Sequence, residues 1–187
     1  IYLSGKNLQE YNLNILRKSI GLVHQKAVLF KGTIRTNLQM ANNNATDDEM
    51  IAALRVAKAF DFVMEKGGLD ALVEENGRNY SGGQKQRITI AQAIVKRPNI
   101  LILDDSTSAL DYMTDAAVRE NIKNYSKDLT TIIISQRASS LKDADKIIVL
   151  DDGKIEGIGT HNELLRDCVV YQEICSSQKE VGGEKNV

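Results

Sequence analysis

Residues 100–105 read Ile-Leu-Ile-Leu-Asp-Asp, four apolar residues followed at once by two carboxylates. Such a run is typical of a strand buried on both faces, as in a parallel sheet covered by helices. Two more β-branched runs follow at Thr131–Ser135 and Lys146–Leu150, and a shorter one, Lys154–Ile158, comes after a turn. We expect four strands here, of which Ile100–Leu103 and Thr131–Ser135 should be fully buried.

Helical periods alternate with these runs, which predicts an α/β fold with a mostly parallel sheet. The segments Thr46-Asp-Asp-Glu49 and Thr160-His-Asn-Glu163 are capping boxes, and each is expected to begin a helix. His161 is then most simply a first-turn residue. Another helix is expected from near Gln84 to Lys96, because the residue before Pro98 resists the α conformation.

Residues 38–97 show a helical pattern without strand runs. We therefore expect a helical subdomain, residues 38–97, inserted into an α/β core formed by residues 1–37 and 98–175. From Ser176 onward the chain is polar and contains glycine, so residues 176–187 are expected to form a flexible tail.

The composition excludes several classes of protein. The 24 basic and 25 acidic residues nearly balance, so no strong field favours nucleic acid. No apolar stretch approaches the roughly 18 to 20 residues of a membrane span, no signal peptide opens the chain, and we expect a soluble domain. Cys168 and Cys175 are spaced to share a helix face with Leu164 and Tyr171, which favours reduced core thiols over a metal site or a disulfide.

The segment Tyr80-Ser81-Gly82-Gly83-Gln84 combines a serine with two glycines ahead of a predicted helix. Glycines let a ligand approach the backbone, and the start of a helix offers free N–H groups to an anion. An ordinary serine cap followed by a glycine turn is the alternative. The sequence Gln84-Lys-Gln-Arg87, with a buried strand that ends in Asp104 some residues later, favours the anion site.

Asp104 and Asp105 follow the predicted strand, at the edge where open α/β sheets bind ligands. A carboxylate at Asp104 can hold Mg²⁺ directly or through water, because hard cations prefer oxygen ligands. Asp105 stands where a general base for an attacking water would lie. Two acids after a strand can also be only a cap or a turn, but Ser108-Ala-Leu-Asp111 follows directly and favours a site.

Together these segments resemble the nucleotide-binding domain of ABC transporters, in its exporter form, from Ile1 to about Tyr171. Tyr80–Gln84 resembles the signature LSGGQ with Tyr for Leu, Ile100–Asp104 the Walker B strand and Ser108–Asp111 the D-loop. Gln25 matches the Q-loop glutamine and Glu75 an acidic loop residue of exporters. The stretch from Ala27 to Leu38 is similar to one that lies near the coupling surface of exporters.

The resemblance implies a P-loop ATPase core with ATP and Mg²⁺ as ligands, Mg²⁺ being held by Asp104 and Gln25. It also implies that Gln25, Ser108 and Asp111 belong to the nucleotide-binding site. The signature would contact the ATP of a second such domain. Transmembrane domains outside this sequence would hold the chain at the cytoplasmic face of the cell membrane. They would also choose the cargo, which this sequence does not reveal.

The sequence departs from the family pattern at three places. No G-x-x-x-x-G-K-[ST] motif occurs, since Gly5-Lys6 is followed by Asn7, so we expect that the front of the domain is missing and that this chain alone is inactive. Asp105 replaces a glutamate, and its carboxylate falls short of the reach that a base needs. Gln136 replaces the switch histidine, and an amide cannot carry its positive charge.

These departures predict a heterodimeric exporter in which this chain contributes a degenerate catalytic site, at Asp105 and Gln136, and an intact signature that serves its partner. Two alternatives remain open. One is an ATP-responsive binding module without hydrolysis. The other is a soluble ABC-type ATPase of DNA maintenance, which should carry a long coiled-coil insertion and a basic surface.

Overall fold

The computed structural model describes residues 1–183, with side chains up to residue 178. The chain divides into two compact units, Ile1–Ile134 and the residues from Ser135 onward. The α/β class with a parallel sheet is confirmed. The predicted boundaries of a helical subdomain at residues 38 and 97 stay a prediction.

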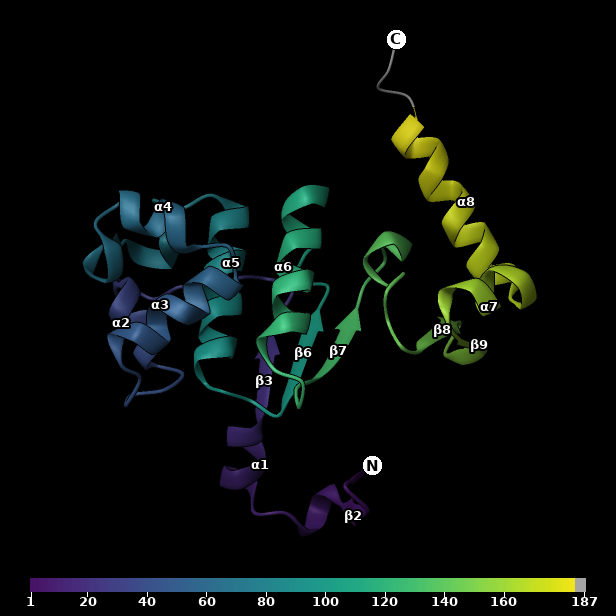
Figure 1. The fold of residues 1–187 in the computed structure, drawn as a ribbon, viewed down its shortest axis with the longest axis horizontal. Coiled ribbons are helices and arrows are strands. Elements are labelled where there is room, and N and C mark those ends of the chain that lie inside the picture. The colour runs from purple at the N-terminus through teal and green to yellow at the C-terminus, as the bar shows by residue number, and fades with distance from the viewer. Residues whose placement is uncertain (184–187) are drawn as a thin grey trace. The chain divides into compact units, whose positions relative to one another are not determined.

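A three-stranded parallel sheet forms the centre of the first unit, in the order β3-β6-β7 (Figure 1). The strands are β3 (Ile20–Val23), β6 (Ile100–Asp104) and β7 (Thr130–Ile134). The long helices of this unit are α5 (Gly82–Val95) and α6 (Tyr112–Tyr125). Because β6 is the central strand, its carboxyl end is held between β3 and β7.

One face of this sheet is tightly packed. Leu101 and Leu103 are almost fully buried, in one apolar cluster with residues of α5 and α6. At Gly21 the approach of α5 is so close that a Cβ would lie 3.2 Å from the carbonyl oxygen of Ala93 and 3.0 Å from Cγ of Pro98. A side chain there would push α5 away, so this glycine permits the contact between helix and strand.

The opposite face of the sheet is open. Leu22, Ile102 and Ile132 lie opposite one another in register, and Leu22 and Ile132 are each 47% exposed. The prediction that Ile100–Leu103 is fully buried is therefore wrong, because Ile102 is only half-buried on this face. The prediction that Thr131–Ser135 is a fully buried strand is wrong for the same reason. The strand exists at Thr130–Ile134, but it is an edge strand and its alternate side chains point away from the packed face.

Three short helices lie beside α5, namely α2 (Ile34–Gln39), α3 (Asp47–Val56) and α4 (Phe60–Glu65) (Figure 1). The predicted capping box begins α3, since Thr46 and Glu49 each accept a hydrogen bond from the backbone N–H of the other. The remaining elements of the unit are β1 (Tyr2–Leu3), β2 (Lys6–Asn7), η1 (Leu8–Glu10), α1 (Leu13–Ser19), β4 (Gly32–Thr33), η2 (Gly68–Asp70), β5 (Leu72–Val73) and η3 (Glu75–Gly77).

The second unit is a hairpin packed with helices. Its elements are η4 (Ala138–Ser140), the antiparallel strands β8 (Ile147–Asp151) and β9 (Lys154–Gly159), and the helices α7 (His161–Asp167) and α8 (Val169–Gly183). Thr160 and Glu163 form the second predicted capping box, and His161 opens α7 as expected. The strands predicted at Lys146–Leu150 and Lys154–Ile158 are confirmed within one residue.

Cys168 and Cys175 are free and buried in one apolar cluster with Leu164 and Tyr171. The prediction of buried reduced thiols is confirmed, but the four residues do not share one helix, because α7 ends before Cys168 and α8 begins after it. The chain that was expected to loosen at Ser176 continues as α8 to Gly183, and residues 184–187 lie outside the described part. No helix within residues 1–183 is long and apolar enough to cross a membrane.

Candidate functional site

The structure joins Gln25 to Asp105, 80 positions apart in sequence. The Nε2 amide of Gln25 donates a hydrogen bond of 2.9 Å to Oδ2 of Asp105. Gln25 lies just after β3 and Asp105 just after β6, and these strands are parallel neighbours. The carboxyl ends of neighbouring parallel strands meet at one sheet edge, which is where ligands of open α/β sheets bind.

The backbone of Asp105 is held on both sides. Its N–H donates to the carbonyl oxygen of Ile134 at 2.8 Å, and its own carbonyl oxygen accepts from Oγ of Ser108 at 2.8 Å. Asp105 has φ 44°, in the left-handed region that few residues other than Gly, Asn and Asp occupy readily. The turn after β6 therefore fixes the direction of this carboxylate.

A buried glutamine of α5 positions the loop that carries Gln25. Gln86 is 1% exposed, and its Nε2 donates to the carbonyl oxygen of His24 at 3.1 Å. Sequence reasoning missed this residue. A signal was present, because Gln86 shares its helix face with Ile90 and Ala93 at spacings of four and seven, and a polar residue on an apolar face has a buried partner.

Ser81 caps α5, the helix at the Tyr80–Gln84 segment. Its Oγ accepts from the Gln84 N–H at 3.2 Å, and Oε1 of Gln84 accepts from the Ser81 N–H at 3.0 Å. Tyr80 is buried, with its ring edge-to-face against Phe62, and this burial raises its pKa. The serine cap considered as an alternative is thus present, and it still leaves the hydroxyl proton of Ser81 free to be donated.

The two glycines of this segment have different surroundings. A Cβ at Gly82 would meet nothing within 4 Å, whereas a Cβ at Gly83 would lie 3.3 Å from the carbonyl oxygen of Ala109. The first turn of α5 therefore packs on the Ser108–Asp111 segment at Gly83 and is open at Gly82. Asp111 in turn caps α6, since its Oδ1 accepts from the Thr114 N–H at 2.9 Å, and this bond lowers its pKa.

Arg87 connects these segments to the short helices. Its Nη1 donates to the carbonyl oxygen of Lys58 at 2.7 Å, and its Nε donates to that of Gly83 at 3.3 Å. Burial lowers the pKa of Arg87, and the negative charges of Asp111 and Asp61 act in the opposite direction. The guanidinium thus links the first turn of α5 to the backbone at Lys58.

The donor set suits a hard cation such as Mg²⁺. Gln25 uses its nitrogen on Asp105, so its amide oxygen stays available, and the carboxylate of Asp104 is half-buried at the end of β6. Mg²⁺ is usually held by one or two carboxylates together with phosphate oxygens and water. No group of three or more His, Cys, Asp or Glu side chains that could hold a metal occurs among the described residues.

Gln136 belongs to the second unit, where one side chain of α8 fixes its backbone. Nε2 of Gln178 donates to the carbonyl oxygen of Gln136 at 2.6 Å, and Oε1 of Gln178 accepts from the Ala138 N–H at 2.9 Å. The place of Gln136 near Asp105 stays a prediction, because the two residues lie in different units.

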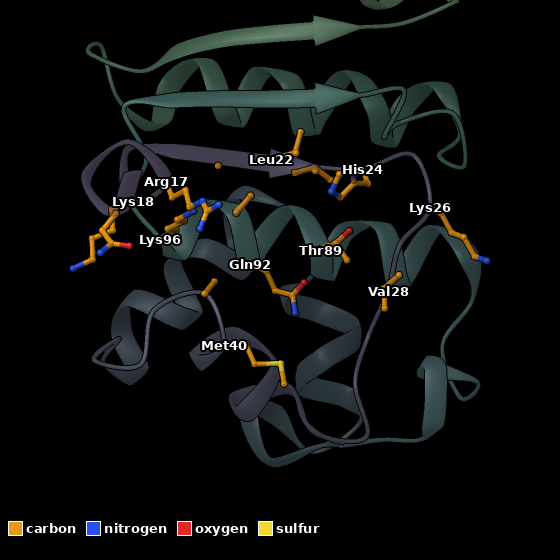
Figure 2. A pocket seen from close by; sticks show the side chains of 15 residues that line it. Arg17, Lys18, Leu22, His24, Lys26, Val28, Met40, Thr89, Gln92 and Lys96 are labelled. Atoms are coloured by element: carbon orange, nitrogen blue, oxygen red, sulfur yellow. The ribbon is translucent and has the colours of Figure 1, made fainter. Parts of the chain in front are cut away.

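A groove of about 660 Å³ runs along β3 and α5 in the first unit (Figure 2). It begins beside the loop of Gln25, since both His24 and Lys26 line it. The other lining residues come from α1, β3 and the loop after it, the residues that follow α2, and α5 with its C-cap: Asn14, Arg17, Lys18, Gly21, Leu22, Val23, Val28, Met40, Ala41, Thr89, Gln92, Ala93 and Lys96.

Comparison with known proteins gives consistent matches. The family model described as ABC transporter matches residues 1–108. An uncharacterised ABC transporter ATP-binding protein of Mycobacterium tuberculosis is 44% identical over 95% of this chain. A putative multidrug export ATP-binding/permease protein of Staphylococcus aureus is 41% identical over 95%. The chain spans 31% of the length of each relative.

A solved structure matches as well. It is a bacterial Atm1-family ABC exporter with ATP bound, with a TM-score of 0.88 and 36% sequence identity. The match covers 94% of this chain and 31% of the exporter chain.

Proposed function

We propose that this chain, which belongs to the ABC transporter family, is the ATP-binding domain of an exporter and pairs with a second such domain around ATP. The observation that carries this proposal is the bond between Gln25 and Asp105 at the carboxyl edge of the sheet. It brings together two residues that the resemblance to the family assigned to one site, at the sheet edge where a nucleotide phosphate and its cation would bind. The names of the relatives support ATP binding and export.

The first turn of α5 would serve the partner's ATP. Free N–H groups and the positive end of the helix dipole favour an anion there. The space at Gly82 allows a phosphate to approach the backbone, and the hydroxyl of Ser81 can donate to it while it caps the helix. These groups would form one half of a composite ATP site, and the second domain would supply the other half.

This chain's own half would hold ATP without cleaving it quickly. Asp105 is one methylene shorter than a glutamate and already accepts a hydrogen bond from Gln25. Gln136 would contribute a neutral amide in place of a histidine. General base catalysis is worth typically 10²–10⁴-fold, so most of that factor should be absent at this half. The partner's half would then perform most of the hydrolysis.

Mg²⁺, when bound, would offset the negative charge of the phosphates. Asp104 and Gln25 would hold it through one carboxylate and one amide oxygen. Asp105 would orient Gln25 toward it through the bond at 2.9 Å.

The groove along β3 and α5 is the surface that would receive the transmembrane domains. It borders the loop of Gln25 and contains Val28, from the stretch that resembles the coupling surface of exporters. A segment bound there would move the same loop that contacts Asp105. The cytoplasmic face of the cell membrane is the location that follows from this arrangement.

The proposal is tested on the complete transporter that contains this chain, by ATP hydrolysis in lipid vesicles. Ser81→Arg places a large cation where the partner's phosphates would lie, and turnover should fall at least about tenfold, as for a lost charge-stabilising contact. Ser177→Arg makes the same change at an exposed position of α8 and should leave turnover unaltered. Equal turnover rates for the two variants would show that Ser81 serves no ATP site. If the wild-type transporter bound ATP without any turnover, the alternative of an ATP-responsive binding module without hydrolysis would be favoured.

A further inference from the structure

The side chain of Gln86 joins α5 to the loop of Gln25. It is 1% exposed, and its Nε2 donates to the carbonyl oxygen of His24 at 3.1 Å. His24 immediately precedes Gln25, whose amide donates to Asp105 at 2.9 Å. Two hydrogen bonds and the backbone between them therefore connect α5 to the carboxyl edge of the sheet.

The two ends of α5 are held differently. At the first turn, a Cβ on Gly82 would meet nothing within 4 Å. Near the other end, a Cβ on Gly21 of β3 would lie only 3.2 Å from the carbonyl oxygen of Ala93. Nζ of Lys96 also donates to the carbonyl oxygen of Ile20 at 2.7 Å. The contact with β3 is therefore the pivot about which a ligand at the first turn would tilt α5.

Gln86 lies between the first turn and this pivot. Because a helix rises by a constant distance per residue, a tilt about Ala93 moves Gln86 roughly two thirds as far as Gly82. Breaking the bond to His24 would leave a buried amide without a partner, which is costly. His24 and Gln25 are exposed, whereas α5 is packed on both β3 and the short helices. The loop is therefore the partner that follows the helix.

A second glutamine of α5 shows that this direction is specific to Gln86. Nε2 of Gln92 also donates to a backbone carbonyl oxygen, that of Asn37 at 2.9 Å, and so ties α5 to α2. The turn of Gln86 also carries Thr89, whose Oγ1 donates to the Gln86 carbonyl oxygen at 2.8 Å. Figure 2 shows His24 at the end of β3, across from the part of α5 that carries Thr89.

We propose that Gln86 is a positioning residue that links the two nucleotides of the paired domains. The partner's ATP, bound at the first turn of α5, would tilt the helix. Gln86 would then seat the loop of Gln25 against Asp105, so that this chain's own half holds its ATP and cation more tightly. This inference rests on the proposed function, which supplies both nucleotides. Coupling between two ligands is reciprocal, so ATP in either half would strengthen binding in the other.

The release rate of the ATP retained by this chain's own half tests the link in the complete transporter. The transporter is loaded with radiolabelled ATP and Mg²⁺ and freed of unbound nucleotide. It is then diluted into buffer with or without a non-hydrolysable ATP analogue, which fills the partner's half. In the wild type the analogue should slow release of the label at least about fivefold, the lower end of typical coupling between sites. Gln86→Met keeps the length of the side chain but has no N–H to donate, so this factor should fall below about twofold.

Two further variants supply a control and a rescue. Nδ2 of Asn121 donates to the carbonyl oxygens of Arg55 and Val56 at 3.3 and 3.2 Å, so Asn121→Leu also removes an amide bond between distant elements. In that variant the analogue should slow release as in the wild type. Gln86→Glu has the same shape, and burial raises the pKa of a carboxyl group at this position. Once protonated it can donate to His24, so the factor should recover as the pH falls, relative to the wild type at the same pH.

Three results would overturn the inference. If Gln86→Met raised both release rates equally and kept their ratio, Gln86 would only support the loop locally, and the proposed function would stand. An equal loss of the ratio in Asn121→Leu would assign the effect to a general loss of stability. If the wild-type transporter retained no ATP, the unequal sites themselves would be refuted, and this inference with them.

Discussion

The position of Asp105 suits it to hold the loop of Gln25 in place through a hydrogen bond. Its backbone is fixed by Ile134 and Ser108 in a left-handed conformation, which Asp and Asn tolerate better than longer side chains do. One carboxylate oxygen already accepts the Gln25 amide. A base for water would need to reach past this contact to the attacking oxygen, and the short side chain does not favour that. The same geometry makes Asp105 a fixed acceptor for the amide of Gln25.

Asp105→Asn separates the two roles. Asparagine keeps an oxygen that can accept from Gln25 and tolerates the left-handed turn, but it cannot take a proton from water. In the complete transporter we expect ATP turnover to stay within about twofold of the wild type, whereas loss of a working base would cost 10²–10⁴-fold. Asp105→Ala, which also removes the acceptor, is the comparison for the loop contact. A loss of several hundredfold in the Asn variant would identify Asp105 as the working base.

Local signals in the sequence predicted helix starts and strand positions well. The capping boxes at Thr46 and Thr160 depend on residues three positions apart, and both are present as expected. The strand at Ile100–Leu103 is also present, because a run of Ile and Leu needs no knowledge of its neighbours, but its predicted full burial is wrong, since only Leu101 and Leu103 are buried. The burial of Thr131–Ser135 was not correct, since it depends on β7 being the edge of its sheet.

The candidate site shows the same division. Its residue types could be chosen from the sequence, but the pairing of Gln25 with Asp105 comes from the parallel register of β3 and β6. The contact of Gln86 with the His24 carbonyl likewise requires α5 to lie on β3, at the place where Gly21 permits it. Contacts between residues 60 or more positions apart in sequence depend on how the elements pack, and no local sequence pattern predicts that packing.

Gly82 and Gly83 provide a matched test of α5. Glycine in a helix costs roughly 0.5–1 kcal/mol relative to alanine. Gly82→Ala places its Cβ in open space, so it should stabilise this chain by up to about that amount, measured by denaturant unfolding. Gly83→Ala must displace the Ala109 carbonyl by a few tenths of an ångström and should gain less. A larger gain for Gly83→Ala would contradict the packing of α5 on the Ser108–Asp111 segment.

At the scale of the whole molecule, the two sets of site residues would serve two different nucleotides. The segment at Ser81–Gln84 would face the partner's ATP, while Asp104, Asp105 and Gln25 would face the nucleotide of this chain's own half. Under the proposed function, Asp105 and Gln136 would therefore weaken one site, while the Ser81–Gln84 segment would still serve the other. An assembly with one slow and one fast site would follow from this arrangement.

Unequal sites should be visible in the fate of bound ATP. The complete transporter is loaded with radiolabelled ATP and Mg²⁺, chased with unlabelled ATP, and the retained nucleotide is analysed over time. We expect one ATP per transporter to be cleaved and exchanged quickly and a second to be retained uncleaved for many turnovers, because the half with Asp105 and Gln136 lacks most of the acceleration that a base provides. Asp105→Glu restores the missing methylene and should shorten that retention. Two nucleotides cleaved at the same rate in the wild type would rule out the division of labour, even if Ser81→Arg abolishes turnover.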